Sequence, residues 1–218
     1  MIIAVSDHTA NRISTQLNYS KKIITIPNGI DMEKINSIKA SGRKSDIIFA
    51  GRMLSHKNLD VLINSVAILK KSKPDILCFL IGDGPEKERL KMQVKNLNLV
   101  KNVIFIDFLE QENDLYSLMK ASKAFILPST REGFGIVVIE ANMCGIPVIT
   151  IQHRDNGARH LISNGKNGYV CELNIDVLAR KIDEVLKNTI DLNISSAVSK
   201  RYDWDTIVAE LEKAYQKI

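Results

Sequence analysis

Short apolar runs alternate with segments of helical period from Ser45 onward, and this alternation constrains the fold more than any other feature of the chain. The apolar runs lie at residues 47–50, 76–81, 103–106, 124–127, 148–151 and 168–173. Helical patterns lie at residues 58–71, 86–97, 114–121 and 136–144 and in the C-terminal tail. Strands that alternate with helices form βαβ units, whose strands run parallel within one sheet. The sequence therefore predicts an α/β fold built on a doubly wound parallel sheet.

Loops rich in glycine and charged residues follow four of these predicted strands. They are Gly51-Arg52, Gly82-Asp-Gly-Pro85, Asp107-Phe108 and the segment from Glu132 to Gly135. The carboxyl ends of parallel strands share one edge of a sheet, and doubly wound sheets bind their ligands beyond that edge. We therefore expect the four loops to converge on one binding site.

The last of these loops is a glycine-rich elbow between a buried strand and the helix that begins near Ile136. Glu132 precedes the elbow, and Glu140 lies about one turn into the helix. Gly133 and Gly135 allow the backbone to approach a ligand, and the unpaired amides of the helix start favour a phosphate. Carboxylate oxygens accept hydrogen bonds from sugar hydroxyls. The pattern favours a donor-sugar site, with two solvated surface acids as the alternative.

Composition places the chain among soluble domains. Its 218 residues, of which 45% are hydrophobic, fit one large domain or one domain plus fragments. No run approaches the roughly 20 apolar residues of a membrane helix, and residues 1–5 are too short for a signal peptide. We therefore expect a cytoplasmic protein, with a position at the inner membrane surface left open. Cys78, Cys144 and Cys171 are isolated in apolar stretches, which predicts reduced core thiols.

The net charge of +5 is compatible with phosphorylated small molecules, an anionic membrane surface or nucleic acid as partners. The lysines are scattered through the predicted helices without interleaved aromatic residues or a nucleic-acid motif. This pattern is typical of a solvated face, so we expect no nucleic-acid partner and leave peripheral membrane contact open.

The first 44 residues follow another pattern. Residues 2–5 form a predicted strand, Ser6 can cap a helix that reaches about Leu17, and residues 37–44 are polar and linker-like. Because so few elements cannot enclose a core, we interpret residues 1–44 as a remnant of a preceding domain plus a hinge. Residues 45–201 then form the ligand-binding domain and residues 202–218 a C-terminal helix, with Trp204 and Tyr215 as packing anchors.

Eight short pieces occur in a recognisable order. They are Val5-Ser6, Pro27-Asn-Gly-Ile-Asp31, Gly51-Arg52 with Lys57, Gly82-Asp-Gly-Pro85, Pro128-Ser129, Glu132-Gly-Phe-Gly135 with Glu140-Ala141, Gly145-Ile-Pro-Val148 and Gly165-Lys-Asn-Gly168. Together they resemble the family 4 glycosyltransferases of the group 1 type, which have the GT-B fold. The resemblance is to the C-terminal, Rossmann-like, nucleotide-sugar-binding domain and covers nearly the whole chain. The glycine-rich loop does not match a nicotinamide dinucleotide site, because the third glycine of that motif and the acidic residue that binds the ribose are missing.

The resemblance implies a retaining, metal-independent transferase that moves a sugar from a nucleotide diphosphate sugar to a saccharide or lipid-linked acceptor. It implies no cofactor and no metal site. Arg52 and Lys57 would hold the donor diphosphate, Glu132 would orient the transferred sugar and Glu140 would bind the ribose. The catalytic residues implied are Glu132, Arg52 and Lys57. The donor-binding set implied is Gly51, Arg52, Lys57, Phe108, Glu132, Gly133, Phe134, Gly135, Ile136, Val137 and Glu140.

Two residues depart from the family pattern. Asp107 stands where a glycine is common, in the loop that usually meets the nucleotide base, and His160 stands where a glutamate is common. We interpret His160 as a helix-turn polar residue, and His8 and His56 as a cap neighbour and a surface residue.

Acceptors of the resembling enzymes are held mainly by the N-terminal domain, of which residues 1–26 would be the part present. We therefore expect the isolated chain to bind donor but transfer poorly without the missing N-terminal domain or a partner chain. A non-catalytic or partner-dependent nucleotide-sugar-binding module is the alternative function. The third candidate function is that of another GT-B enzyme, such as a phosphorylase or a sugar-nucleotide epimerase.

Overall fold

A six-stranded, all-parallel sheet forms the centre of the computed structural model, which describes residues 1–188 and 200–216. The strands are β3 (Ser45–Ala50), β4 (Cys78–Ile81), β5 (Val103–Ile106), β6 (Ser122–Leu127), β7 (Val148–Ile151) and β8 (Gly168–Cys171). Their spatial order is β5-β4-β3-β6-β7-β8, so the direction of winding reverses between β3 and β6. The predicted doubly wound sheet is confirmed.

Central strands that are buried on both faces explain the continuous apolar runs. Ile47, Ile48 and Phe49 of β3 are completely buried. Ile48 lies beside Phe125 of β6, and the Phe49 and Phe125 rings stack with their centroids 6.5 Å apart. The sheet therefore supplies the middle of one continuous hydrophobic core.

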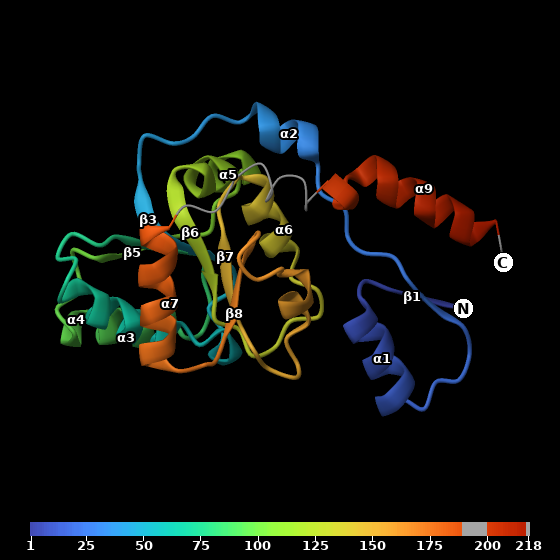
Figure 1. Cartoon of the computed structure of the whole chain (residues 1–218), viewed down its shortest axis with the longest axis horizontal. Coiled ribbons are helices and arrows are strands. Elements are labelled where there is room, and N and C mark those ends of the chain that lie inside the picture. The colour runs from blue at the N-terminus through green and yellow to red at the C-terminus, as the bar shows by residue number, and fades with distance from the viewer. Residues whose placement is uncertain (189–199, 217–218) are drawn as a thin grey trace.

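Helices cover both faces of this sheet (Figure 1). One group comprises α3 (Leu59–Lys70), α4 (Lys87–Asn96) and α7 (Ile175–Lys187), and the other comprises α2 (Met32–Ser37), α5 (Glu112–Lys120) and α6 (Ile136–Met143). The two groups lie on opposite faces because right-handed crossovers leave the centre in opposite directions. None of the helices in the described ranges combines the length and apolarity that a membrane crossing requires.

A smaller unit lies beside this body (Figure 1). In it, β1 (Ile2–Ala4) and β2 (Ile23–Thr25) pair in parallel and are joined by α1 (Asp7–Gln16). The Ser6 side chain accepts a hydrogen bond from the Thr9 amide at 3.0 Å, so its predicted capping role is confirmed. Helix α9 (Trp204–Tyr215) packs on this unit through Ile207 and Ala214, which form a second small core with Ile26.

The predicted packing anchors of the C-terminal helix need a correction. Tyr215 is 64% exposed, so its predicted anchoring role is wrong. Trp204 is 46% exposed, although its ring lies so close to Gly29 that a β-carbon there would be 2.6 Å from the indole. The buried residues of α9, Ile207 and Ala214, lie on a neighbouring face of the helix. The apolar pattern in the sequence did not distinguish that face from the face that carries Trp204 and Tyr215.

Residues before position 45 also contribute to the large core. Ile30 and Ile35 are buried in it, and α2 contacts α6. Lys120 donates hydrogen bonds to the carbonyls of Ile35 and Ile38, at 2.5 and 2.7 Å. The helix α2 was not anticipated from sequence, and the domain boundaries at residues 44 and 201 remain a prediction.

The three cysteines should react with a thiol reagent only after the chain unfolds. Cys78, Cys144 and Cys171 are all buried, as their apolar settings predict. Burial raises the pKa of Cys144 to about 12, that of Cys171 to about 11 and that of Cys78 further still. The thiolate is the reactive form, so slow labelling is expected at pH 8. Labelling with a chromogenic disulfide in buffer and in denaturant measures this, and one fast thiol in the folded chain would contradict it.

Candidate functional site

A cavity of about 710 Å³ opens at the carboxyl edge of the sheet, beyond β3, β4 and β5. It is lined by Ala50, Gly51, Arg52, Ile81, Gly82, Asp83, Gly84, Phe108, Leu109, Leu115 and Val137. Three of the four loops singled out from sequence line it, and Val137 in the first turn of α6 connects it to the fourth. The cavity also lies where the winding reverses, the position at which doubly wound sheets bind ligands.

The loops after β3 and β4 fit together through glycine. Gly82 has a φ of 127°, and a β-carbon on it would lie 2.2 Å from the Gly51 carbonyl oxygen. A β-carbon on Gly84 would lie 2.5 Å from the Met53 carbonyl oxygen, whereas the Met53 amide donates to the Asp83 carbonyl at 2.8 Å. Backbone therefore forms this wall of the cavity, and side chains are excluded from it.

Arg52 follows Gly51 and projects from this wall. Its side chain is exposed and lines the cavity. Within residues 1–188 and 200–216 its guanidinium has no hydrogen-bond or ion-pair partner. A planar cation in this position can bind two oxygens of a phosphate group at once.

Lys57 and Glu132 form a short ion pair and are not among the residues that line the cavity. Lys57 ends a 3₁₀ helix (Ser55–Lys57), and its Nζ lies 2.5 Å from Glu132 Oε1. The side chains are only 15% and 14% exposed. Sequence predicted that both would act on one ligand, and the structure places them in direct contact with each other.

Main-chain hydrogen bonds fix the loops that carry this pair. The Thr130 amide donates to the His56 carbonyl at 2.9 Å, and Asn58 Nδ2 donates to the Pro128 carbonyl at 2.9 Å. Glu132 is held on both sides, because its amide donates to the Asp155 carbonyl at 3.0 Å and its carbonyl accepts from the Gly157 amide at 2.7 Å. The carboxylate therefore projects from a rigid segment.

The elbow leads directly into α6. Gly135 precedes the helix with a φ of 92°, and a β-carbon on it would lie 2.5 Å from the Ala158 side chain. No side chain of the described residues caps this helix end. The first amides, including those of Ile136 and Val137, are therefore left for a ligand or water, and Val137 lines the cavity.

Two residues of the elbow face away from this cavity. Phe134 is buried against Tyr202, with ring centroids 5.9 Å apart, and lines a different cavity. The Gly133 carbonyl accepts hydrogen bonds from Ser6 Oγ at 2.6 Å and Thr9 Oγ1 at 3.1 Å. The elbow is therefore a partition, with Glu132 on one side and contacts to the N-terminal unit on the other.

Glu140 is set deeper, in the middle of α6. Its Oε1 accepts a hydrogen bond from Tyr116 Oη at 2.9 Å. Burial raises the pKa of Glu140, and the Tyr116 hydrogen bond acts in the opposite direction. Its Oε2 has no hydrogen-bond partner in the described part of the chain, which leaves one acceptor for a ligand hydroxyl. Tyr116 was missed from sequence because an aromatic residue in a helix carries no signal that distinguishes it from core.

Asp107, the departure at the predicted base loop, pairs with Lys87. Their charged atoms lie 2.6 Å apart, and Lys87 Nζ also lies 3.4 Å from Asp83. The hydrogen bond from Lys87 lowers the pKa of Asp107. Asp107 is not among the residues that line the cavity, whereas Phe108 is, with 74% of its surface exposed. Asp107 therefore pairs with Lys87 outside the cavity, and its neighbour Phe108 is the residue of this loop that lines the cavity.

Two histidines that sequence reasoning set aside come together on the other side of the elbow. The rings of His8 and His160 lie 6.2 Å apart. Burial is the main cause that lowers the pKa of each, and nearby arginines add to it. His56 is half-buried beside Lys57, and burial lowers its pKa as well. No local sequence pattern signals the contact between His8 and His160, because 152 positions separate them along the chain.

No cluster of three histidine, cysteine or acidic side chains that could hold a metal ion is found in the described ranges. Arg52, Lys57 and the first α6 amides are the cationic or N–H donor groups that the loops at this edge of the sheet carry.

Comparison with known proteins places the chain among sugar-transferring enzymes. The family model described as "Glycosyl transferases group 1" matches residues 31–211. An uncharacterised glycosyltransferase of Haemophilus influenzae is 30% identical over 170 residues, which are 78% of this chain and 47% of that protein. A UDP-Gal:alpha-D-GlcNAc-diphosphoundecaprenol alpha-1,3-galactosyltransferase of Escherichia coli is 28% identical, over 88% of this chain and 52% of that protein. The chain spans about half the length of these relatives.

Solved structures agree in fold. HepE of Anabaena in complex with UDP superposes with a TM-score of 0.85 at 24% identity, covering 100% of this chain and 64% of that one. A glycosyltransferase of Rickettsia africae gives the same TM-score at 21% identity and covers 99% and 62%. At such identities the likeness concerns the fold, and the fold is that of GT-B glycosyltransferases.

Proposed function

The chain belongs to the group 1 glycosyltransferases, and on this premise we propose that its 218 residues bind the nucleotide diphosphate sugar of a retaining, metal-independent transferase. The acceptor would be a saccharide or a lipid-linked saccharide, a class to which the Escherichia coli relative's named acceptor belongs. Because the chain spans about half of its relatives, we assign it donor binding and assign transfer to the complete site.

One observation supports this proposal: within the described residues, the cavity at the winding reversal is lined by an unpaired arginine, Arg52, and by Val137 of a helix start without a side-chain cap. The Lys57–Glu132 pair does not line the cavity and is carried by loops that follow β3 and β6. We assign the diphosphate to Arg52, Lys57 and the first α6 amides, since all three present N–H donors or positive charge. Phe108 and the apolar wall formed by Leu109 and Leu115 suit the flat nucleobase.

The two glutamates receive separate roles. We assign Glu140 Oε2 to a ribose hydroxyl, because Oε1 is already occupied by Tyr116. We assign Glu132 to hydroxyls of the transferred sugar, since it lies on the rigid elbow next to the phosphate cations. Donor binding would then require Lys57 to exchange the Glu132 carboxylate for a phosphate oxygen.

We propose that transfer occurs with retention, by attack on the face of the leaving group, a route that requires no carboxylate nucleophile. The proposal assigns hydroxyl-binding roles to both carboxylates, Glu132 toward the transferred sugar and Glu140 toward the ribose, and uses neither as a nucleophile. The acceptor hydroxyl would attack the anomeric carbon on the face of the leaving group. The bond from that carbon to the phosphate oxygen breaks, and the same phosphate takes the hydroxyl proton. Arg52 and Lys57 would stabilise the charge of the departing diphosphate.

Thermal unfolding in the presence of UDP, GDP and ADP and of their sugars tests donor binding. At about 100 times its dissociation constant the correct nucleotide should add roughly 2.7 kcal/mol of stability. The increase should persist in excess chelator, because no step of the proposal uses a metal ion. An unchanged unfolding temperature with every nucleotide would refute donor binding, and loss of the shift in chelator would refute metal independence.

A further inference from the structure

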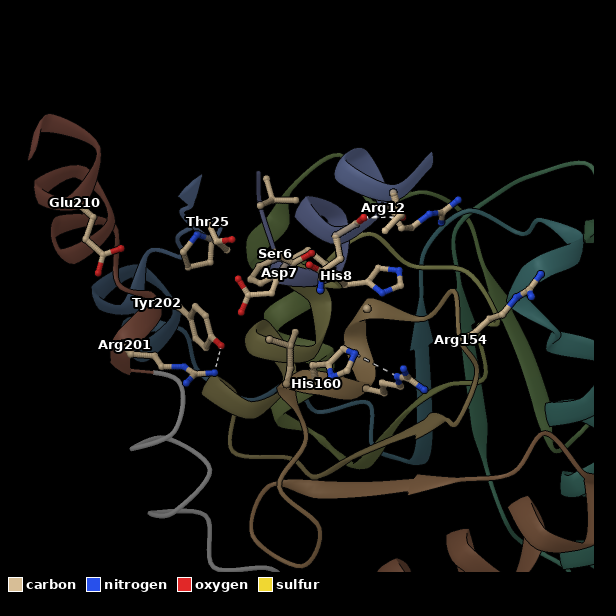
Figure 2. Close-up of a pocket in the computed structure, with 18 residues that line it drawn as sticks. Ser6, Asp7, His8, Arg12, Thr25, Arg154, His160, Arg201, Tyr202 and Glu210 are labelled. Atoms are coloured by element: carbon tan, nitrogen blue, oxygen red, sulfur yellow. Dashed lines mark hydrogen bonds between the residues drawn. The ribbon is translucent and has the colours of Figure 1, made fainter. Parts of the chain in front are cut away.

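A second cavity, of about 670 Å³, lies between the N-terminal unit and the loop that follows β7. Figure 2 shows its walls: residues after β1 and in α1 form one side, and the 3₁₀ helix η2 (Gly157–Leu161) lies on the other. Tyr202 and Glu210 form one end. The cavity is separate from the proposed donor site, and none of its lining residues in the described ranges except Phe134 belongs to the donor-binding set.

Positive charge dominates this cavity. Four arginines line it, Arg12, Arg154, Arg159 and Arg201, against two carboxylates, Asp7 and Glu210. Asp155 offsets part of the charge from outside the lining, but its contacts are long, at 3.8 Å to Arg12 and 3.5 Å to Arg154. In the described residues Arg159 has no carboxylate partner, and its Nε donates to His160 Nε2 at 3.3 Å. The cations are therefore incompletely compensated.

An unsatisfied nitrogen points to the same place. His8 Nε2 is buried and has no hydrogen-bond partner among the described residues. A buried polar atom without a partner costs about 1–3 kcal/mol, and such atoms often mark the position of a ligand or water. Its ring lies next to that of His160, with the ring centroids 6.2 Å apart, and Figure 2 shows Arg12 and Arg154 to one side of the pair. The unsatisfied nitrogen, the second imidazole and the arginines therefore belong to one group of residues that lines this cavity.

The position of this cavity relative to the elbow indicates which ligand would enter. Phe134 and Gly157 line it, while Glu132, two residues before Phe134, faces Lys57 on the donor side. Ser6 and Thr9 close the elbow against α1 through the Gly133 carbonyl. A ligand here would therefore lie across the partition from the donor diphosphate and next to the transferred sugar, which is where an acceptor has to approach.

We propose that this cavity binds a phosphate group carried by the acceptor, through Arg12, Arg159 and the imidazoles of His8 and His160. This rests on the proposed function for the identity of the acceptor, whereas the anion site rests on the cavity itself. Arginine forks and imidazole N–H groups are suitable donors to phosphate oxygens. The phosphate can belong to a soluble phosphorylated saccharide or to an isoprenyl diphosphate carrier, since both present the same group.

The test uses the whole chain, saturated with whichever nucleotide stabilises it, so that the donor site is filled. Inorganic phosphate, inorganic pyrophosphate, glucose 1-phosphate and farnesyl diphosphate are then titrated while the histidine ring signals are followed by NMR. Burial is the main cause that lowers the pKa of His8 and His160, and nearby arginines add to it. A bound anion should raise both pKa values, because it favours the charged imidazolium and offsets the arginines. Stronger binding of farnesyl diphosphate than of pyrophosphate indicates a lipid carrier, and a preference for glucose 1-phosphate indicates a soluble acceptor.

Arg159→Gln and Arg12→Gln should each weaken this binding by about tenfold and leave nucleotide affinity unchanged. Arg180→Gln, an exposed arginine on α7, removes the same charge far from the cavity and should change neither. Anion affinity unaffected by the Arg159 and Arg12 substitutions, or histidine signals that do not move, would overturn the inference. Because the ring signals report on this cavity directly, they remain informative if no nucleotide binds, an outcome that would refute the donor proposal by itself.

Discussion

Replacing Lys57 with methionine should weaken nucleoside diphosphate binding by about 10- to 100-fold, because a cation–phosphate hydrogen bond contributes about 1.5–3 kcal/mol. The same substitution should destabilise the chain, since it leaves the Glu132 carboxylate without its partner in a setting where it is only 14% exposed. Breaking a fully buried pair costs about 3–5 kcal/mol, and partial solvent access reduces this to about 1–2 kcal/mol. Calorimetric titration and urea unfolding measure the two effects.

A second substitution separates the structural effect from the loss of a phosphate ligand. Adding Glu132→Gln to Lys57→Met removes the uncompensated charge, so stability should largely recover while nucleotide binding stays weak. Glu132→Gln alone should bind nucleoside diphosphate at least as tightly as the unaltered chain, because Lys57 is released, but should lose the additional affinity for the nucleotide sugar.

Lys34→Met provides the matched control for these variants. Lys34 forms an equally direct pair with Glu112, at 2.7 Å, but on an exposed surface. Its removal should leave nucleotide affinity unchanged and alter stability much less than the loss of Lys57 does, because water screens an exposed pair. If Lys57→Met bound nucleotide as well as Lys34→Met does, the assignment of Lys57 to the diphosphate would be wrong.

The sheet and the position of the first cavity could be predicted because they depend on local patterns. A buried parallel strand appears in the sequence as an apolar run. The loop that follows it lies at the carboxyl edge of the sheet, where ligands bind. Gly82 and Gly135 stand out in the sequence because a close approach excludes a side chain, and the structure places both at such an approach. At Gly51 a β-carbon would make ordinary contact with Phe49, and the positive φ of 149° is the feature that favours glycine there. The fold and the place of this cavity therefore followed from spacing alone.

Pairings between distant side chains had no local signal. Tyr116 on Glu140, Lys87 on Asp107 and His8 beside His160 each join residues from different elements. The packing of the helices on the sheet decides which side chains come into contact. A single sequence contains no local pattern that indicates these contacts. For this reason Asp107 and His160 stood out in sequence as departures from a family pattern, while their partners became visible in the structure.

The error at Tyr215 has a related origin. The helix α9 has apolar residues on more than a single face, and period alone does not tell which of them meets a neighbour. Ile207 and Ala214 are buried because the β1–β2 unit lies on their side, and Trp204 and Tyr215 lie on the adjacent, more exposed side. Burial on that helix is thus decided by a unit formed at the opposite end of the chain.

Replacing Gly82 with alanine should destabilise the chain by at least about 3 kcal/mol and abolish nucleotide binding. Two costs combine at this position: a positive φ of 127° and a β-carbon 2.2 Å from the Gly51 carbonyl oxygen. A strained backbone conformation costs about 1–3 kcal/mol, and forced overpacking costs a similar amount. The clash involves backbone on both sides, so relief requires the loops after β3 and β4 to separate, which would displace Arg52 from the cavity.

Substitutions at two other glycines separate the cost of a positive φ from the cost of the steric clash at Gly82. Gly165 has a φ of 77°, and a β-carbon on it would meet no atom of the described residues within 4 Å, so Gly165→Ala should cost about 1–2 kcal/mol from conformation alone. Gly42 has neither feature, so Gly42→Ala should stay within about 0.5 kcal/mol of the unaltered chain. Urea unfolding of the three variants ranks them, and nucleotide titration should detect a loss for Gly82→Ala alone. Equal stability of the Gly82 and Gly165 variants would mean that the loops after β3 and β4 can separate at no cost in free energy. The proposal that these loops form a rigid wall of the donor site would then be wrong.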